Sequence, residues 1–105
     1  MKVEQFRRLM EEQFDIIRRT EEEKRPLYAK KPDRLCHFKD SGDAKGETPE
    51  RALWGMWVKH YTAMRYVLDD IDEGKLPSAA YLNELIKDLV FYPILLKALI
   101  LERYV

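Results

Sequence analysis

The sequence lacks the features that several large classes of functional site require. Cys36 is the only cysteine, so the chain cannot form an internal disulfide. It stands beside His37, but no second pair of ligands at zinc-binding spacing accompanies these two residues. The few glycines form no phosphate-binding loop, and there is neither a nucleophile elbow nor a pair of histidines four residues apart. These absences exclude a disulfide scaffold and argue against zinc and P-loop chemistry.

A net charge is also missing, since 19 basic residues balance 19 acidic ones. Without an overall positive field, the chain gives no clear indication of nucleic-acid binding. The most apolar stretch, 89–101, is interrupted by Pro93 and Lys97 and is shorter than the roughly 20 residues of a membrane span. The charged first segment has no apolar signal-peptide core. We therefore expect no membrane contact and a cytoplasmic location, in the host cell if the chain is phage-encoded.

Helical periodicity is what the sequence does contain. Apolar residues recur at spacings of three and four along three segments, which predicts helices over about 2–23, 49–73 and 79–103. The connection 24–48 is expected to be a loop. The length of 105 residues suits one domain. We predict an all-α fold, a three-helix antiparallel bundle spanning 1–105.

The second and third predicted helices have clear end signals. Thr48 is placed to cap the second helix, with Pro49 at its first position, and Gly74 is placed to end it. Ser78 is the expected cap of the third helix. Pro93 lies within that helix, where we expect a kink and not an end, because the apolar periodicity continues on both sides.

The connection 24–48 contains residues typical of turns from Ser41 to Gly46. It also contains an apolar cluster, 35–38, that is expected to pack on the bundle. Such a long connection is often functional, and it is either a functional loop or one that holds a short helical turn. The second helix is apolar on more than one side. It therefore needs the loop or another subunit to cover it, which predicts a homo-oligomer, for example through a face from Trp54 to Tyr66.

Asp88 is the most suggestive polar residue of the third helix. Glu84 lies one turn before it and Tyr92 one turn after it on the same side. Two carboxylates at this spacing can share a hard cation such as Mg²⁺. The alternative is a solvated helix edge that Lys87 and Arg65 neutralise.

Several basic residues could hold an anion. Lys59 could reach a phosphate from the helical hairpin, and Lys30, Lys31 and Arg34 lie in a locally basic stretch of the connection. His60, on the apolar stripe of the second helix, is either a half-buried core residue or a ligand-binding group. The basic stretch has an equally simple interpretation as a solvated loop.

Five stretches of the sequence carry a resemblance to known proteins. They are Asp33-Arg34-Leu35-Cys36-His37-Phe38-Lys39, Thr48-Pro49-Glu50-Arg51-Ala52-Leu53-Trp54-Gly55-Met56, Lys59-His60, Gly74-Lys75-Leu76-Pro77 and Asp88-Leu89-Val90-Phe91-Tyr92-Pro93-Ile94-Leu95-Leu96. Over about 33–101 the chain resembles small uncharacterised helical proteins of bacteriophages and prophages. The last stretch is also similar to a signature of MazG-like, all-α nucleoside triphosphate pyrophosphohydrolases, in which Asp88 and Tyr92 match the aspartate and the tyrosine.

This resemblance implies a site in which four acids from two helices hold Mg²⁺ against a triphosphate. The acids available here are Glu12, Asp15, Glu84 and Asp88. Leu85 stands where the family has an acid, and Phe91 replaces an asparagine, so a degenerate site is expected. The predicted function is binding of a nucleotide or related phosphate ligand, with pyrophosphohydrolase-like activity if the site is active. The alternative is a non-enzymatic phage inhibitor that binds a host protein or sequesters a host signal.

Overall fold

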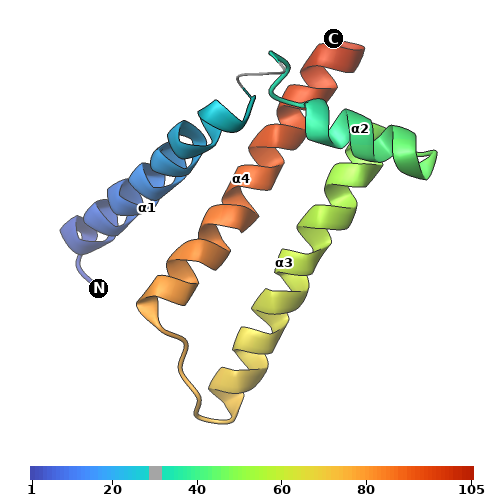
Figure 1. Ribbon diagram of the computed structural model, residues 1–105. Coiled ribbons are helices and arrows are strands. Elements are labelled where there is room, and N and C mark those ends of the chain that lie inside the picture. The colour runs from blue at the N-terminus through green and yellow to red at the C-terminus, as the bar shows by residue number, and fades with distance from the viewer. Residues whose placement is uncertain (29–31) are drawn as a thin grey trace.

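The computed structural model describes residues 1–28 and 32–105, and regular secondary structure in these ranges is entirely helical (Figure 1). The elements are α1 (Val3–Lys24), the short 3₁₀ helix η1 (Arg25–Tyr28), α2 (Cys36–Lys45), α3 (Pro49–Asp72) and α4 (Ala79–Tyr104). The predicted all-α class is confirmed. None of the described helices is long and apolar enough to cross a membrane.

The predicted ends of α3 and α4 are confirmed. The Thr48 hydroxyl accepts a hydrogen bond of 3.2 Å from the Arg51 amide, and the Ser78 hydroxyl accepts one of 3.1 Å from the Tyr81 amide. Gly74 follows α3 in the left-handed conformation, with φ of 80°, which an L side chain rarely adopts. These local signals need no tertiary contact, which is why the sequence alone reveals them.

The connection between α1 and α3, predicted as a loop or a loop with a short helical turn, contains more helix than predicted. The described part of 24–48 holds η1 and the ten-residue helix α2, so four α-helices stand where three were predicted. Ser41 and Gly42 lie inside α2 and make no turn. A Cβ atom on Gly42 would lie 2.7 Å from the carbonyl oxygen of Glu47, so this glycine permits close packing. Gly46, with φ of 68°, is the residue that ends α2.

The long helices lie side by side in the order α1, α4, α3, and α2 crosses the end of α3 near the C-terminus (Figure 1). Helix α4 continues through Pro93 without ending, as predicted. Helix α1 packs on α4 and makes no contact with α3 within the described residues. The three long helices therefore form an open layer, and the predicted three-helix antiparallel bundle is not confirmed.

The core lies at the end of this layer where α2, α3 and α4 meet. Its buried residues form one cluster, made of Leu35, Phe38, Leu53, Leu95 and Leu99. Leu53 and Leu99 are fully buried. The prediction that the apolar cluster before and within α2 packs on the other helices is confirmed, and α2 is the lid of this core.

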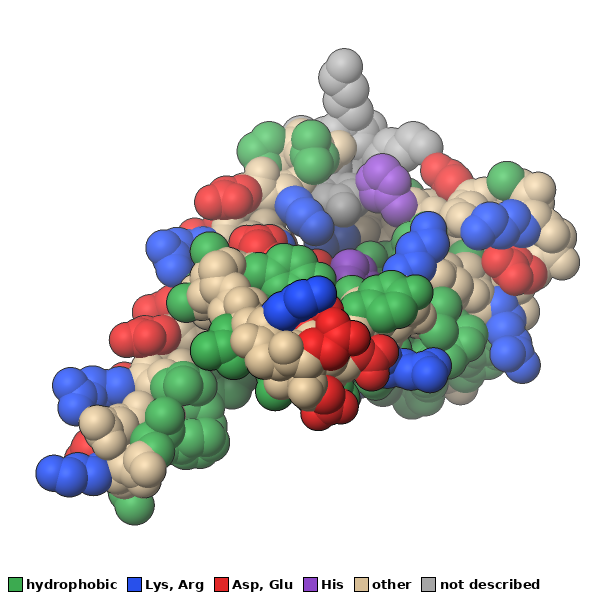
Figure 2. Space-filling model, turned by 90° about the horizontal axis from the view of Figure 1, so that it is seen from below, with side chains coloured by type: hydrophobic (Ala, Val, Ile, Leu, Met, Phe, Trp, Pro, Cys, Tyr) green, Lys and Arg blue, Asp and Glu red, His purple; other side chains and the backbone are tan. Residues whose placement is uncertain are grey.

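The remainder of the molecule is unusually open. The radius of gyration is 16.3 Å, whereas a compact domain of this length has about 13 Å. Many large apolar side chains are exposed on α1, α3 and α4. Figure 2 shows apolar side chains along one side of the arm that projects at the left, with charged side chains on its other side. The chain has more apolar surface than its own core can bury.

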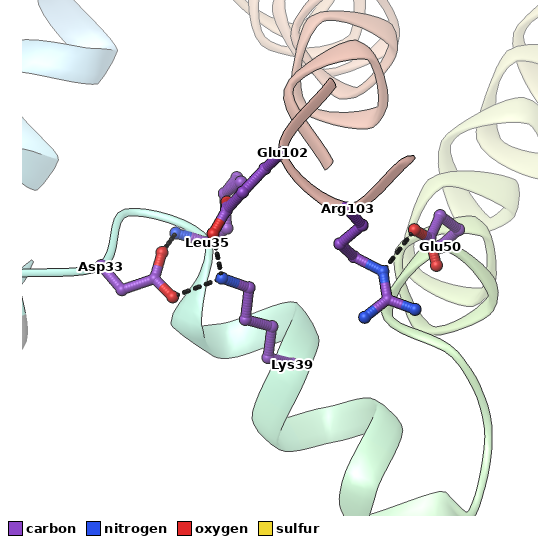
Figure 3. A network of polar contacts seen from close by, with 6 residues as sticks. All are labelled: Asp33, Leu35, Lys39, Glu50, Glu102 and Arg103. Carbon is purple, nitrogen blue, oxygen red and sulfur yellow. Dashed lines mark hydrogen bonds and ion pairs between the residues drawn. The ribbon is translucent and has the colours of Figure 1, made fainter. Parts of the chain in front are cut away.

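Ion pairs fasten the C-terminal end of α4 to the lid (Figure 3). The ammonium of Lys39 lies 2.6 Å from a carboxylate oxygen of Asp33 and 2.6 Å from one of Glu102. Arg103 donates a hydrogen bond of 2.8 Å to Glu50, at the start of α3. The contacts of Glu102 and Arg103 join residues that are far apart in the sequence, and they connect the end of α4 to α2 and α3.

Candidate functional site

A hollow of about 230 Å³ lies where the end of α1, the start of α2 and the middle of α4 converge, with α3 behind them. Its charged and polar lining consists of Lys24, Arg34, His37 and Asp88. Its apolar lining consists of Phe38, Met56, Phe91, Tyr92 and Leu95. This is the place in the described residues where basic side chains, an acid and aromatic rings line one hollow.

Arg34 stands at the edge of the hollow against an aromatic ring. Its guanidinium carbon lies 5.7 Å from the centre of the Phe91 ring, within the range of a cation–π contact. Such a contact favours a defined orientation of the guanidinium plane. Arginine presents a rigid fork of N–H donors that matches phosphate and carboxylate oxygens, so the residue is suited to anion recognition.

Asp88 and His60 form a pair between α4 and α3. A carboxylate oxygen of Asp88 lies 3.5 Å from Nδ1 of His60, and the two side chains are 28 and 27 % exposed. The His60 ring lies 5.2 Å from the Tyr92 ring. Lys87 approaches the other oxygen of Asp88 at 3.9 Å. Asp88 is therefore partly buried between Lys87 and His60, and His60 lies against a ring of the hollow.

The four acids that the resemblance implies do not come together. Glu84 pairs with Lys87 and lines a different hollow, between α1 and α4. Asp15 lies in an exposed ion pair with Arg18, 2.8 Å long, and Glu12 is exposed. The described residues contain no group of three or more histidine, cysteine, aspartate or glutamate residues placed to hold a metal ion.

The geometry around Lys87 agrees with the simpler interpretation of Glu84 and Asp88. Lys87 contacts both carboxylates. It therefore neutralises this edge of α4, as the alternative interpretation of a solvated helix edge predicts. Binding of Mg²⁺ stays a prediction, and the residues present do not fit a four-carboxylate centre.

The predicted phosphate-binding residues separate into three groups. Arg34 and Tyr92 line the hollow, and His60 stacks on Tyr92 behind it. Lys59 is exposed on α3 and is not among the residues that line the hollow. The predictions for Lys30 and Lys31 fall outside the residues that the structure describes.

The sequence patterns do not predict that Lys24, His37 and Phe91 line one hollow. The sequence suggests a role for His37 only together with Cys36, yet Cys36 is buried while His37 is exposed beside the hollow. Residues 24, 37 and 91 come together only because α2 folds over α3 and α4. No local pattern in the sequence signals that placement.

Comparison of the chain with protein-family models, with curated proteins and with solved structures gives no match. The resemblances to phage proteins and to MazG-like enzymes stay predictions. Fold and site together define an all-α protein with a small hollow lined by cations and aromatic rings, and the functional proposal depends on that geometry.

Proposed function

We propose that this protein binds a small phosphate-bearing ligand, such as a mononucleotide, in the hollow between Arg34, His37 and Phe91. The observation that supports the proposal is the combination of two basic side chains and three aromatic rings around one partly enclosed space. Cations recognise phosphate oxygens, and aromatic faces stack on a planar base.

The lining residues have distinct roles in this proposal. Arg34 and Lys24 bind the phosphate oxygens from one side of the hollow, and His37 adds a ring nitrogen at its edge. Tyr92 and Phe91 provide the apolar faces for the planar part. Asp88 accepts a hydrogen bond from a sugar hydroxyl or a base amino group. The ammonium of Lys87, 3.9 Å from the carboxylate, reduces its repulsion of the phosphate.

The volume restricts the class of ligand. About 230 Å³ is below the roughly 300–1,000 Å³ of sites for drug-sized molecules. We therefore propose a single mononucleotide or a smaller phosphate compound that remains partly exposed. A long triphosphate would extend into solvent, where Mg²⁺ could accompany it without a dedicated protein site.

Binding without turnover is the form of the function that the geometry supports. A pyrophosphohydrolase needs a metal held against the phosphate chain, and the carboxylates proposed for that task are apart. We propose a non-enzymatic binding protein that acts in the cytoplasm.

The test is a thermal-shift and calorimetric titration with inorganic phosphate, pyrophosphate and the nucleoside mono-, di- and triphosphates, with and without Mg²⁺. We expect one of these probes to raise the melting temperature and to bind the unaltered chain. Arg34→Ala should weaken that binding about 10- to 100-fold, as expected for the loss of a hydrogen bond to a charged group worth roughly 1.5–3 kcal/mol.

Lys59→Ala is the matched control, because Lys59 is an exposed cation of α3 away from the hollow. It should bind as the unaltered chain does, and circular dichroism should show unchanged helix in both variants. No shift with any probe, or equal losses in the two variants, would contradict the proposal. Release of pyrophosphate from a triphosphate would contradict its non-enzymatic part.

The second candidate is the interaction protein, a phage inhibitor that binds a host protein. The extent of exposed apolar surface on α1 and α3 favours it. A chain that stays monomeric by itself and forms a complex of fixed stoichiometry with one host protein would support this candidate. Self-association, which the sequence also predicts, involves the same apolar surface and is a separate property from ligand binding.

A further inference from the structure

We infer that Lys39 is a positioning residue for Arg34, because it fixes the turn from which Arg34 reaches the hollow. The inference deepens the proposed function and rests on it for the consequence for ligand affinity. Lys39 belongs to α2 and is not among the residues that line the hollow. Its ammonium lies 2.6 Å from a carboxylate oxygen of Asp33 and 2.6 Å from one of Glu102. It therefore joins the residue before Arg34 to the end of α4 (Figure 3).

Arg34 is an inner residue of a tight turn that precedes α2. The Cys36 amide donates a hydrogen bond of 3.2 Å to the carbonyl oxygen of Asp33, and the Leu35 amide donates one of 3.0 Å to the Asp33 carboxylate. Aspartate at the first position of a turn commonly accepts such a bond from the residue two places on. Asp33 therefore closes the turn around Arg34 with both its backbone and its side chain.

Two anchors of different kinds attach this turn to the rest of the molecule. After Arg34, Leu35 is buried in the core cluster together with leucines of α4. Before Arg34, the second carboxylate oxygen of Asp33 accepts a hydrogen bond of 2.6 Å from Lys39. Burial therefore fixes one end of the turn, and the contacts of Lys39 fix the other end.

The contacts of Lys39 differ from the isolated surface ion pairs of the chain. The Lys39 side chain is 28 % exposed and serves two carboxylates, whereas Arg7 and Arg18 are 60 and 71 % exposed in their pairs within α1. Isolated exposed pairs contribute little to stability, and a network of charges with good geometry contributes more. The Lys39 network is therefore suited to hold a turn in one arrangement.

The anchor and the ring that Arg34 contacts come from the same helix. Phe91 and Glu102 both belong to α4, about three helical turns apart, and the Arg34 guanidinium carbon lies 5.7 Å from the centre of the Phe91 ring. The contact of Lys39 with Glu102 therefore fixes the turn relative to the helix that provides the ring. Ordering a long side chain costs free energy on binding, and a site that orders it beforehand avoids part of that cost. We therefore expect Lys39 to increase the affinity for a phosphate.

The first test measures the motion of Arg34 in the full chain without any ligand. Nuclear magnetic resonance relaxation of the Arg34 Nε–H group, identified by its absence in Arg34→Lys, reports that motion. We expect restricted motion in the unaltered chain, and faster motion with a smaller ring-current shift from Phe91 in Lys39→Met. Lys39→Arg keeps donors for both carboxylates and should restore the restricted motion. Equal motion in the unaltered chain and Lys39→Met would overturn the inference.

Two control variants separate positioning from a general loss of charge or stability. Lys45→Met removes an exposed cation at the end of the same helix. Glu50→Gln weakens the neighbouring contact with Arg103 and leaves the turn unaltered. Both controls should keep the motion of Arg34 restricted. If Glu50→Gln released Arg34 as much as Lys39→Met does, the effect would be a loosening of the whole end of the molecule, and the inference would be wrong.

The second test is calorimetric, with the tightest-binding probe among inorganic phosphate, pyrophosphate and the nucleoside phosphates. Lys39→Met should weaken binding about 2- to 10-fold, the cost of ordering one loose side chain. In the Arg34→Ala background the same substitution should cause no further loss, because Lys39 acts through Arg34. Losses of equal size in the two backgrounds would overturn the inference, since Lys39 would then act on the ligand or on the fold directly.

The two tests keep this inference separate from the proposed function. A chain that binds none of the probes contradicts the proposed function alone, because the motion of Arg34 is measured without ligand. Released motion in Lys39→Met together with unchanged affinity for a bound probe contradicts the role of Lys39 in binding and leaves the proposed function intact.

Discussion

Glu50 is the residue whose ionisation most directly links the ends of α3 and α4. Burial by itself would raise its pKa, but a hydrogen bond from its own backbone amide, together with the hydrogen bond and charge of Arg103, outweighs that effect. The pKa of Glu50 therefore lies below its ordinary value of 4.5. The hydrogen bond from Lys39, and then the one from the Leu35 amide, likewise lower the pKa of Asp33.

A carboxyl group with a lowered pKa in the folded state stabilises the fold when it is ionised. That contribution is fully present above pH 4.5, the ordinary value for Glu50, and is lost as the pH falls through the lowered value. We expect the urea midpoint of the chain to decrease as the pH falls from about 5 to 3.

The variant Glu50→Gln should show a smaller decrease over the same range, because it cannot lose that charge. Glu73→Gln, which alters an exposed acid after α3, should follow the unaltered chain. If Glu50→Gln and the unaltered chain had parallel pH profiles, the role assigned to the Glu50–Arg103 pair would be wrong.

At the scale of the element, the packing of α2 requires a glycine at position 42, whereas α3 has room for a side chain at Gly55. Gly42 of α2 is buried, and an added Cβ would lie 2.7 Å from the backbone oxygen of Glu47. Gly55 lies inside α3, and a Cβ there would meet nothing within 4 Å. The same substitution should therefore have opposite effects in the two helices.

We expect Gly42→Ala to lower the free energy of unfolding by about 1–3 kcal/mol, because the lid must move away from α3. Gly55→Ala should raise that free energy by up to about 1 kcal/mol, because alanine has a higher helix propensity. Thermal and urea denaturation followed by circular dichroism measure both. A stabilised Gly42→Ala would show that α2 does not pack closely on the segment before α3.

The helices themselves were predictable to different degrees. The ends of α3 and α4 follow from Thr48, Gly74 and Ser78, whose effects act over a single turn of the chain. Helix α2 was not predicted, because Ser41, Gly42 and Asp43 have turn propensity and its stability comes from burying Phe38 and Leu35 against α3 and α4. Tertiary packing overrides local propensity at such positions.

At the scale of the whole molecule, the core is concentrated at one end and the opposite end is thinly packed. Buried residues such as Leu53 and Leu99 lie where α2, α3 and α4 meet, while the first half of α1 exposes most of its apolar side chains. Local opening should therefore cost little free energy in a single chain at the thin end.

Hydrogen exchange should reveal this difference in stability. Amides of the first half of α1 should exchange much faster than those around Leu53 and Leu99. Protection of the first half of α1 equal to that around Leu53 and Leu99 would contradict this difference in stability.

The candidate site was predictable only in part. The sequence predicts Asp88 and Tyr92 on one side of the third helix and His60 on the apolar stripe of the second, but their proximity appears only in the structure. The role of His37 was not predictable, because its place at the hollow depends on a helix that the sequence did not indicate. The four acids appeared related through a motif, but Asp15 pairs with Arg18 and Glu84 with Lys87, and the described residues show no cluster of them.

The sequence by itself determined the helical class, the limits of α3 and α4 and the surplus of apolar residues. Each of these depends on periodicity or on contacts within one turn, which a single helix expresses alone. Only the tertiary structure decided that α2 closes the core, that Arg34 and His37 meet Asp88 at one hollow, and that α1 keeps an uncovered face. Those outcomes depend on which apolar side chains of each helix are buried against a neighbouring helix. The packing of the helices in space decides that.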